Sequence, residues 1–176
     1  MTNPLERNAA EERFRPVFAH LGAVTAYARR RGHRDPDAVA AEVMTIAWRR
    51  LADVPRDDPR PWLFKTARNL LLADARRALP ATGAVAAEGA APAPDLIELD
   101  SALGDALRAL SPADREALLL VAWEDLTPAQ AARSLGINAT AFRVRLLRAR
   151  RRLQQKLADE HVARCEPSPN LDVETT

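Results

Sequence analysis

The stretch LTPAQAARSLGINATAFRVRLLRARRRL, residues 126–153, decides the fold of the second half of the chain. Thr127 is followed three residues later by Gln130, which is the spacing of a capping box at the start of a helix. That helix is short, because Gly136 favours the left-handed conformation in which helices commonly end. A longer helix follows at once. A short helix, a glycine turn and a longer helix predict a helix-turn-helix.

The longer helix is expected to have one apolar face and one basic face, with Asn138 capping its start. The apolar residues that recur at helical spacing are Phe142, Leu146, Ala149, Leu153 and Leu157. The opposite face carries Thr140, Arg143, Val144, Leu147, Arg148 and Arg151. Residues 139–158 include seven Lys or Arg and no Asp or Glu, so this helix predicts binding to DNA phosphates.

The first turns of such a helix enter the major groove in helix-turn-helix proteins. We therefore expect Arg143 to pair with guanine, since a guanidinium can donate two parallel hydrogen bonds to that base. Val144 is suited to a thymine methyl group, and Thr140 to a phosphate or a base. Phosphate contacts, which position the helix without reading sequence, are expected from Arg148, Arg151 and Arg152. The alternative is a basic surface helix that packs only within the molecule.

The composition favours an all-α protein. Of the 176 residues, 47% are hydrophobic but only 5% are aromatic, and Ala and Leu, both good helix formers, supply much of the apolar content. Residues 1–80 carry 15 basic and 10 acidic side chains, residues 81–128 carry 2 and 9, and residues 129–164 carry 9 and 2. Two basic blocks separated by an acidic one suggest two surfaces for a polyanion, although solvated helix faces would give the same pattern.

The chain divides into two small helical domains joined by a flexible linker. Residues 80–94, PATGAVAAEGAAPAP, are rich in Pro, Ala and Gly and lack apolar periodicity, which is typical of a linker. The linker separates an N-terminal domain, residues 10–79, from the helix-turn-helix domain, residues 95–158. Residues 159–176 are expected to form a disordered tail.

Three helices are expected in the N-terminal domain. The first covers residues 11–31 and ends at Gly32. The second begins near Pro36, and its apolar side chains recur at helical spacing as Ala40, Val43, Met44, Ala47, Trp48 and Leu51. The third covers residues 61–79, after the polar loop of residues 53–60. In the C-terminal domain, two further helices are expected over 95–110 and 111–123, and the core is expected to include Trp48, Trp62 and Trp123.

A second basic stripe lies on the third expected helix, where Lys65, Arg68, Asn69 and Arg76 fall on one side. The loop of residues 53–60 is long enough to form a pocket for a base extruded from DNA. On these residues alone, a solvated helix face explains the stripe equally well.

Other classes of protein are disfavoured. The single cysteine, Cys165, excludes an internal disulfide, and without a secretory leader or a long apolar run the sequence favours a cytoplasmic protein. His20, His33 and His161 lie on separate segments and there is no Gly-rich phosphate loop, so neither an enzyme nor a cofactor is expected. His161 and Cys165 have the spacing of two ligands on a helix turn, but zinc needs more, so no metal is expected.

Three segments together resemble the extracytoplasmic-function group of bacterial sigma factors. The segment RPWLFKTARNLLLADARR, residues 60–77, is similar to the end of their region 2, and EVMTIAWRRL, residues 42–51, is similar to the helix before it. The segment DALRALSPADREALLLVAWEDLTPAQAARSLGINATAFRVRLLRARRRL, residues 105–153, is similar to their region 4. The resemblance covers residues 14–158 apart from the linker. Either module alone is a weak signal, but both in this order make a strong one.

The resemblance implies a transcription initiation factor whose partners are core RNA polymerase, promoter DNA and an inhibitory anti-sigma factor. It implies contact with the −35 element by Asn138, Thr140, Arg143, Val144, Arg145, Arg148 and Arg151. It implies contact with the −10 element by Asp53, Arg56, Asp57, Asp58, Arg60, Lys65, Arg68, Asn69 and Arg76. It places polymerase on Glu42, Ile46 and Arg49, and Ile46 supports this because it is an apolar residue on the polar side of its helix.

The chain departs from the family pattern at four positions. Ala38 and Ala41 stand where members usually carry Asp and Gln that contribute to polymerase contact. Val144 and Leu147 stand where small polar or basic residues are usual, which bears on the −35 sequence that is read. The main alternative is a two-domain helix-turn-helix regulator that acts without polymerase. A further hypothesis is that the acidic block, residues 81–128, masks the basic DNA-binding faces in the free protein.

Overall fold

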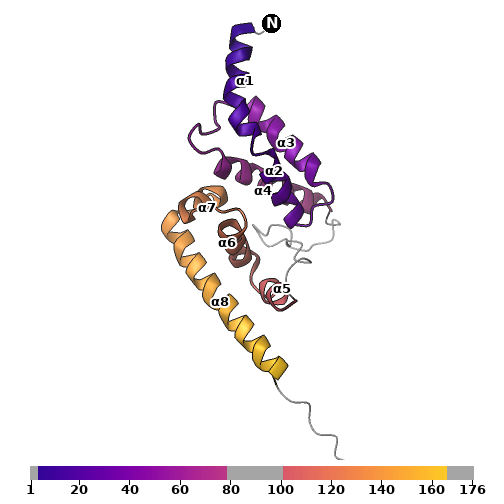
Figure 1. Ribbon diagram of the computed structural model, residues 1–176, viewed down its shortest axis with the longest axis vertical. Coiled ribbons are helices and arrows are strands. Elements are labelled where there is room, and N and C mark those ends of the chain that lie inside the picture. The colour runs from indigo at the N-terminus through magenta and orange to yellow at the C-terminus, as the bar shows by residue number, and fades with distance from the viewer. Residues whose placement is uncertain (1–3, 79–100, 166–176) are drawn as a thin grey trace, which may run out of the picture.

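The structure is a computed structural model that describes residues 4–78 and 101–165. These residues form helices only (Figure 1). The helices are α1 (Pro4–Phe18), α2 (Leu21–Arg30), α3 (Pro36–Arg49), α4 (Arg60–Ala78), α5 (Ser101–Arg108), α6 (Pro112–Ala122), α7 (Pro128–Leu135) and α8 (Ala139–Cys165). Within the described ranges, no helix combines the length and the apolar character needed to cross a bilayer. The all-α prediction is confirmed, while the predicted linker, residues 80–94, lies outside the described residues.

The prediction of one helix over residues 11–31 is wrong. The structure has α1 starting at Pro4 and a separate helix α2, with a turn at residues 19–20 between them. The turn changes the direction of the chain, so that Val17 of α1 and both Val24 and Tyr27 of α2 are buried in the same core. Gly32 has a φ of 66°, so the glycine stop after α2 is confirmed.

The helices α3 and α4 form as predicted and supply most of the N-terminal core. The Asp35 side chain accepts a hydrogen bond of 2.9 Å from the backbone nitrogen of Ala38, which caps α3. One face of α3 and one of α4 are buried, through Val39, Ala40, Val43, Met44, Ala47, Leu63, Phe64, Ala67 and Leu71. The prediction that Trp48 is a core residue is wrong, since it is 41% exposed and packs edge-on against Phe14. Trp62 and Trp123 are half-buried.

The helix-turn-helix is confirmed in α7 and α8. Both hydrogen bonds of the capping box between Thr127 and Gln130 are present, and Gly136 ends α7 with a φ of 66°. Upstream, Arg115 of α6 donates to the carbonyl oxygens of Leu107 and Arg108 at 2.8 Å, which satisfies the C-terminal end of α5. The helix α8 continues to Cys165, beyond the expected end at residue 158.

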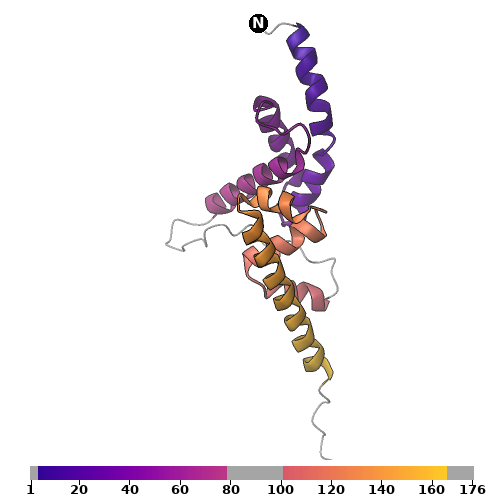
Figure 2. The same ribbon diagram turned by 90° about the vertical axis from the view of Figure 1, so that its left-hand side faces the viewer.

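The two halves pack against each other. Helix α7 lies on α4, and the buried apolar side chains of both halves form a continuous cluster. Figures 1 and 2 both show α7 against the N-terminal half, while α1 and α8 extend away from the junction in opposite directions. The candidate DNA-binding residues of each half therefore belong to one body, in which some lie at the junction and others face solvent.

Candidate nucleic-acid interface

The outward face of α8 is the larger basic surface. Phe142 and Ala149 are 0% exposed and Leu146 is 5% exposed, so packing against α6 and α7 fixes how the helix is rotated. On the other side, the exposed residues are Thr140, Arg143, Val144, Leu147, Arg148 and Arg151. This is the set that helical spacing predicted. Burial of one face thus presents three arginines and two apolar side chains together.

Two residues near this face have partners within the molecule. The Asn138 side chain accepts a hydrogen bond of 2.7 Å from the backbone nitrogen of Thr140, so it caps α8. Arg152 pairs with the buried carboxylate of Asp114 in α6. Arg145 is half-buried and lines the same groove, of about 500 Å³, as Asp114 and Arg152. Through this ion pair, Asp114 fixes the position of Arg152 at the edge of the basic face next to α6.

The nine residues expected at the −10 element lie on α4 and on the loop before it. Lys65, Asn69 and Arg76 of α4 and Asp53, Arg56 and Asp57 of the loop are exposed. The other three, Asp58, Arg60 and Arg68, are half-buried. Arg68 lies close enough to Tyr27 for its charge to act on that hydroxyl, so it is turned toward the interior more than its neighbours are. The stripe is therefore continuous along α4 but not uniformly open to solvent.

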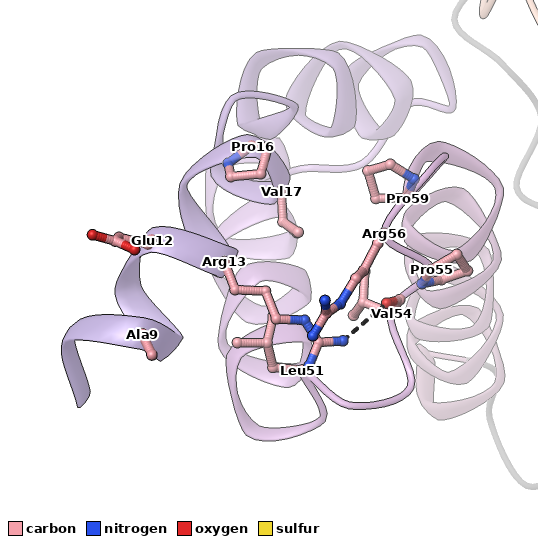
Figure 3. A pocket seen from close by; sticks show the side chains of 10 residues that line it. All are labelled: Ala9, Glu12, Arg13, Pro16, Val17, Leu51, Val54, Pro55, Arg56 and Pro59. Atoms are coloured by element: carbon pink, nitrogen blue, oxygen red, sulfur yellow. Dashed lines mark hydrogen bonds between the residues drawn. The ribbon is translucent and has the colours of Figure 1, made fainter. Parts of the chain in front are cut away.

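A pocket of about 430 Å³ lies between α1 and the loop (Figure 3). Its walls are mainly apolar, and its lining includes Pro16, Val17, Leu51, Val54, Pro55 and Pro59. Figure 3 shows the guanidinium groups of Arg13 and Arg56 side by side within it, while Glu12 points away. Arg13 donates to the carbonyl oxygen of Val54 at 3.4 Å, which joins α1 to the loop. Apolar walls with two cations suit a flat aromatic group that carries negative charge.

The three residues expected to meet polymerase share one side of α3. Glu42 and Arg49 are exposed, and Ile46 between them is half-buried. A separate apolar patch lies where α1 meets α3, because Phe18 is 51% exposed and Trp48 is 41% exposed. This patch was not foreseen, since Trp48 follows the apolar periodicity of the α3 core.

A charged network joins the two halves. Arg31 of the N-terminal half is 0% exposed, and it donates to both carboxylate oxygens of Glu116, at 3.2 and 2.9 Å, and to Glu124 at 3.2 Å. Arg30 also pairs with Glu124, and the Tyr27 hydroxyl donates to Glu116 at 3.1 Å. We call Arg30, Arg31, Glu116 and Glu124 the ionic network. Its two positive and two negative charges balance, which is what buried ions require.

Burial and charge shift the ionisation of groups at this junction. Desolvation lowers the pKa of Arg31, but the neighbouring Tyr27 hydroxyl and, after it, the carboxylates of Glu116 and Glu124 more than offset this, so its pKa is raised overall. Burial, together with the hydrogen bond to Glu116, raises the pKa of the Tyr27 hydroxyl. Burial, and after it the positive charge of Arg60, lowers the pKa of His20 below its usual 6.5. Arg31 therefore stays charged at neutral pH, while His20 is kept neutral.

A second set of contacts links the loop of residues 53–60 and the start of α4 to the turn after α6 and to α7. Asp58 accepts from Gln130 at 3.0 Å and from Arg133 at 2.8 Å. Arg60 donates to the carbonyl oxygens of Glu124 and Asp125, the second at 3.5 Å. The ammonium group of Lys65 lies beside Gly136. We call these the docking contacts. They involve three residues that the sequence predicts to contact DNA, Asp58, Arg60 and Lys65.

The structure alters the hypothesis that acidic residues mask the DNA-binding faces. Glu116 and Glu124, from the acidic block, pair with Arg30 and Arg31, which were not expected to bind DNA. Asp114 does pair with a basic residue of α8, Arg152. The exposed face of α8 described above remains open. Side chains of α7 and backbone carbonyl oxygens at residues 124–125, not acidic side chains, are what reach Asp58 and Arg60.

Fold and surfaces thus define a two-part helical protein that carries a helix-turn-helix with a solvent-facing basic helix. Residues 100–153 match the family described as sigma-70, region 4. No curated protein sequence matches the chain.

Three solved structures are similar to the chain in fold. CnrH, in complex with the cytosolic domain of CnrY, has a TM-score of 0.59 and 28% identity, with 83% of this chain and 88% of that chain covered. The sigma factor RpoE, with the anti-sigma factor NepR from Bartonella quintana, has a TM-score of 0.58 and 22% identity, with 81% and 94% covered. The PhyRSL–NepR complex from Sphingomonas sp. Fr1 gives 0.58 and 21%, with 91% and 95% covered. Residues 100–153 are thus a sigma-70 region 4 module, and the fold of the chain is similar to the folds of CnrH and of the sigma factor RpoE.

Proposed function

We propose that this sigma factor binds core RNA polymerase in the cytoplasm and directs it to promoters by reading two separate elements. Residues 95–158 would read the −35 duplex, and residues 10–79 would read the −10 strand. The observation that carries the proposal is the outward face of α8, where exposed Arg143, Arg148 and Arg151 surround Val144 on a helix whose rotation is fixed by its buried side. Such a helix fits the major groove and offers both base and phosphate contacts.

Reading of the −35 element would be shared between base and phosphate contacts. Arg143 and Val144 lie in the first turns of α8, where recognition helices meet base edges, and Thr140 precedes them. Arg148 and Arg151 follow along the exposed side and suit phosphates. We assign supporting roles to Asn138, which caps the helix, and to the half-buried Arg145.

Reading of the −10 element would use α4 and its preceding loop. Lys65, Asn69 and Arg76 would follow the strand, with Arg68 behind them. The pocket under the loop would accept a base turned out of the stack, with its phosphate near Arg13 and Arg56. Unstacking a base costs a few kcal/mol, and the apolar walls and two guanidinium groups offer contacts that offset this. The exposed loop residues Asp53 and Asp57 would accept hydrogen bonds from base amino groups.

Polymerase would bind along α3, on Glu42, Ile46 and Arg49. The test is gel filtration of the full chain with purified core polymerase, and we expect the two to co-elute. Ile46→Glu should abolish co-elution, because it places a charge in the centre of the contact. Ala52→Glu adds the same charge at an exposed position just beyond α3 and should leave co-elution intact. A chain that binds DNA but never joins polymerase would instead be a helix-turn-helix regulator that acts alone.

An inhibitory partner also belongs to this proposal. The similar RpoE structure is a complex with an anti-sigma factor, and CnrH is likewise solved with the cytosolic domain of another protein. We propose that this chain binds an anti-sigma factor as well. Affinity capture from the native cell, followed by mass spectrometry, tests this; recovery of polymerase subunits alone would count against it.

A further inference from the structure

The contacts between the halves fall unevenly on the two proposed DNA-reading surfaces. The docking contacts engage Asp58, Arg60 and Lys65, all of which belong to the proposed −10 surface. The proposed −35 surface has no comparable cover, since its outward residues on α8 are exposed. The junction between the halves therefore covers part of the proposed −10 surface and leaves the proposed −35 surface exposed.

Hydrogen bonds at the junction compete directly with nucleic acid. One guanidinium nitrogen of Arg60, Nη2, donates to backbone carbonyl oxygens at residues 124–125, so a phosphate that is to bind Arg60 bidentately through this nitrogen would have to displace them. Gln130 and Arg133 both donate to one oxygen of the Asp58 carboxylate, Oδ2, so a base would have to compete with them for that oxygen. The ammonium group of Lys65 sits against the turn at Gly136. A DNA strand can replace these partners of Asp58 and Arg60 only after residues 124–136 have moved away, whereas Lys65 remains partly open to solvent.

The ionic network holds α7 in this place. Arg31 is fully buried between two glutamates from the other half, and separating the halves returns all of these charges to water together. Buried ion pairs contribute little net stability because desolvation offsets their attraction, but removing one partner is strongly destabilising. The ionic network therefore sets how the two halves align when they are packed together, which we call the closed state, but it adds little net free energy to that state. When the two halves separate, water can hydrate the charged and polar side chains of Asp58, Gln130 and Arg133.

We infer that residues 124–136, comprising the turn after α6 and helix α7, are an intramolecular occupant of the −10 surface, so that the free chain exposes its −35 reader while its −10 reader is partly covered. This inference rests on the proposed function for the identity of the two surfaces. It predicts an order of events: duplex DNA can be bound by the closed chain, whereas single-stranded DNA gains access only when the halves separate.

The test uses the full chain and two variants of equal charge change. In E116Q/E124Q, the ionic network loses both negative charges while the side chains keep their size. In the matched control D74N/D105N, two carboxylates that pair with Arg77 and Arg108 of their own halves are neutralised instead. Dyes at Cys165 and at an E6C substitution on the exposed part of α1 report the separation of the halves by energy transfer.

DNA binding is measured by anisotropy with two probes, a short mixed-sequence single strand and a mixed-sequence duplex, at the same low salt concentration. For E116Q/E124Q, we expect reduced energy transfer and an increase of at least about tenfold in affinity for the single strand, because the competent state becomes populated. Affinity for the duplex should change by less than about twofold. The D74N/D105N control should match the parent in all three measurements.

A second variant, R133A, tests the inference independently in case E116Q/E124Q does not fold. R133A removes one of the docking contacts from a side chain that is largely exposed, so the helical circular dichroism should be unchanged. It should raise affinity for the single strand in the same direction, by a smaller factor. The inference is overturned if E116Q/E124Q opens the chain without a gain on the single strand, or if neither variant alters energy transfer. These readouts come from the isolated chain, so failure to bind polymerase would refute the proposed function separately.

Discussion

Removal of single methyl groups from bound DNA would probe how α8 reads sequence. Val144 is 42% exposed and Leu147 is 63% exposed, and they lie one helical turn apart between the arginines of the outward face. Neither residue belongs to the buried core of the C-terminal half. In a major groove, the apolar group they would meet is the C5-methyl of thymine. We therefore expect the preferred −35 duplex to carry thymine opposite at least one of these two residues.

The size of the effect follows from the area removed from water. Burial of one methyl or methylene group is worth about 0.8 kcal/mol, which corresponds to a change of roughly fourfold in affinity. Replacing the contacted thymine by uracil deletes the methyl group and leaves every hydrogen-bonding group in place. One such replacement should thus weaken binding by about fourfold, while uracil at uncontacted positions should have no effect.

The assay starts with duplexes selected by the full chain from a random library, followed by anisotropy on thymine-to-uracil versions, one position at a time. At each sensitive position, either Val144→Ala or Leu147→Ala should abolish the sensitivity, because the partner of the methyl group is gone. Arg148→Ala serves as the contrast: it should weaken all duplexes alike and lower the salt dependence by about one phosphate contact. If uracil is tolerated at every position by the unaltered chain, this account of Val144 and Leu147 is refuted.

Four further outcomes are expected. Arg143→Ala should cost about 1–3 kcal/mol of binding and relax the selected sequence at one G·C pair, as read by repeating the library selection. Phe142→Ala should destabilise the C-terminal half by about 3–5 kcal/mol in urea unfolding, since the ring is 0% exposed. Gly136→Ala should cost about 1 kcal/mol or more in the same assay, because the residue holds a φ of 66°. Because the pKa of His20 is lowered in the folded chain, the unfolded chain binds the proton more readily; the free energy of unfolding should therefore be retained above about pH 6.5 and fall as the pH drops below it. Urea titrations across this range check the slope, which His20→Asn should reduce.

Much of the C-terminal half is predictable because its signals are local. The capping box at Thr127, the glycine at Gly136 and the apolar period from Phe142 onward each act over a few residues, and all three appear in the structure. The exposed set on α8 follows from the same period. By contrast, the break between α1 and α2 carries no comparable signal, because Pro16 lies inside α1 and Gly22 inside α2 while the turn itself falls at residues 19–20.

Contacts between distant segments could not be read from the sequence. Arg31 meets Glu116 and Glu124 across separations of 85 and 93 residues, and none of these side chains differs in type from a solvated surface residue. The same holds for Arg13 of α1, which donates to the carbonyl oxygen of Val54 in the loop of residues 53–60. Periodicity failed for Trp48 because it tests whether a residue faces the core, not whether the core extends far enough to cover it.

Transcription with reconstituted core polymerase on a library of random-sequence templates, with sequencing of the 5′ ends of the RNA, tests the proposed role most directly. We expect RNA chains that appear only when this protein is added and that start at a fixed distance from two enriched sequence blocks, one for each half of the chain. RNA output no greater than that of core polymerase alone, or enrichment of a single block, would contradict it.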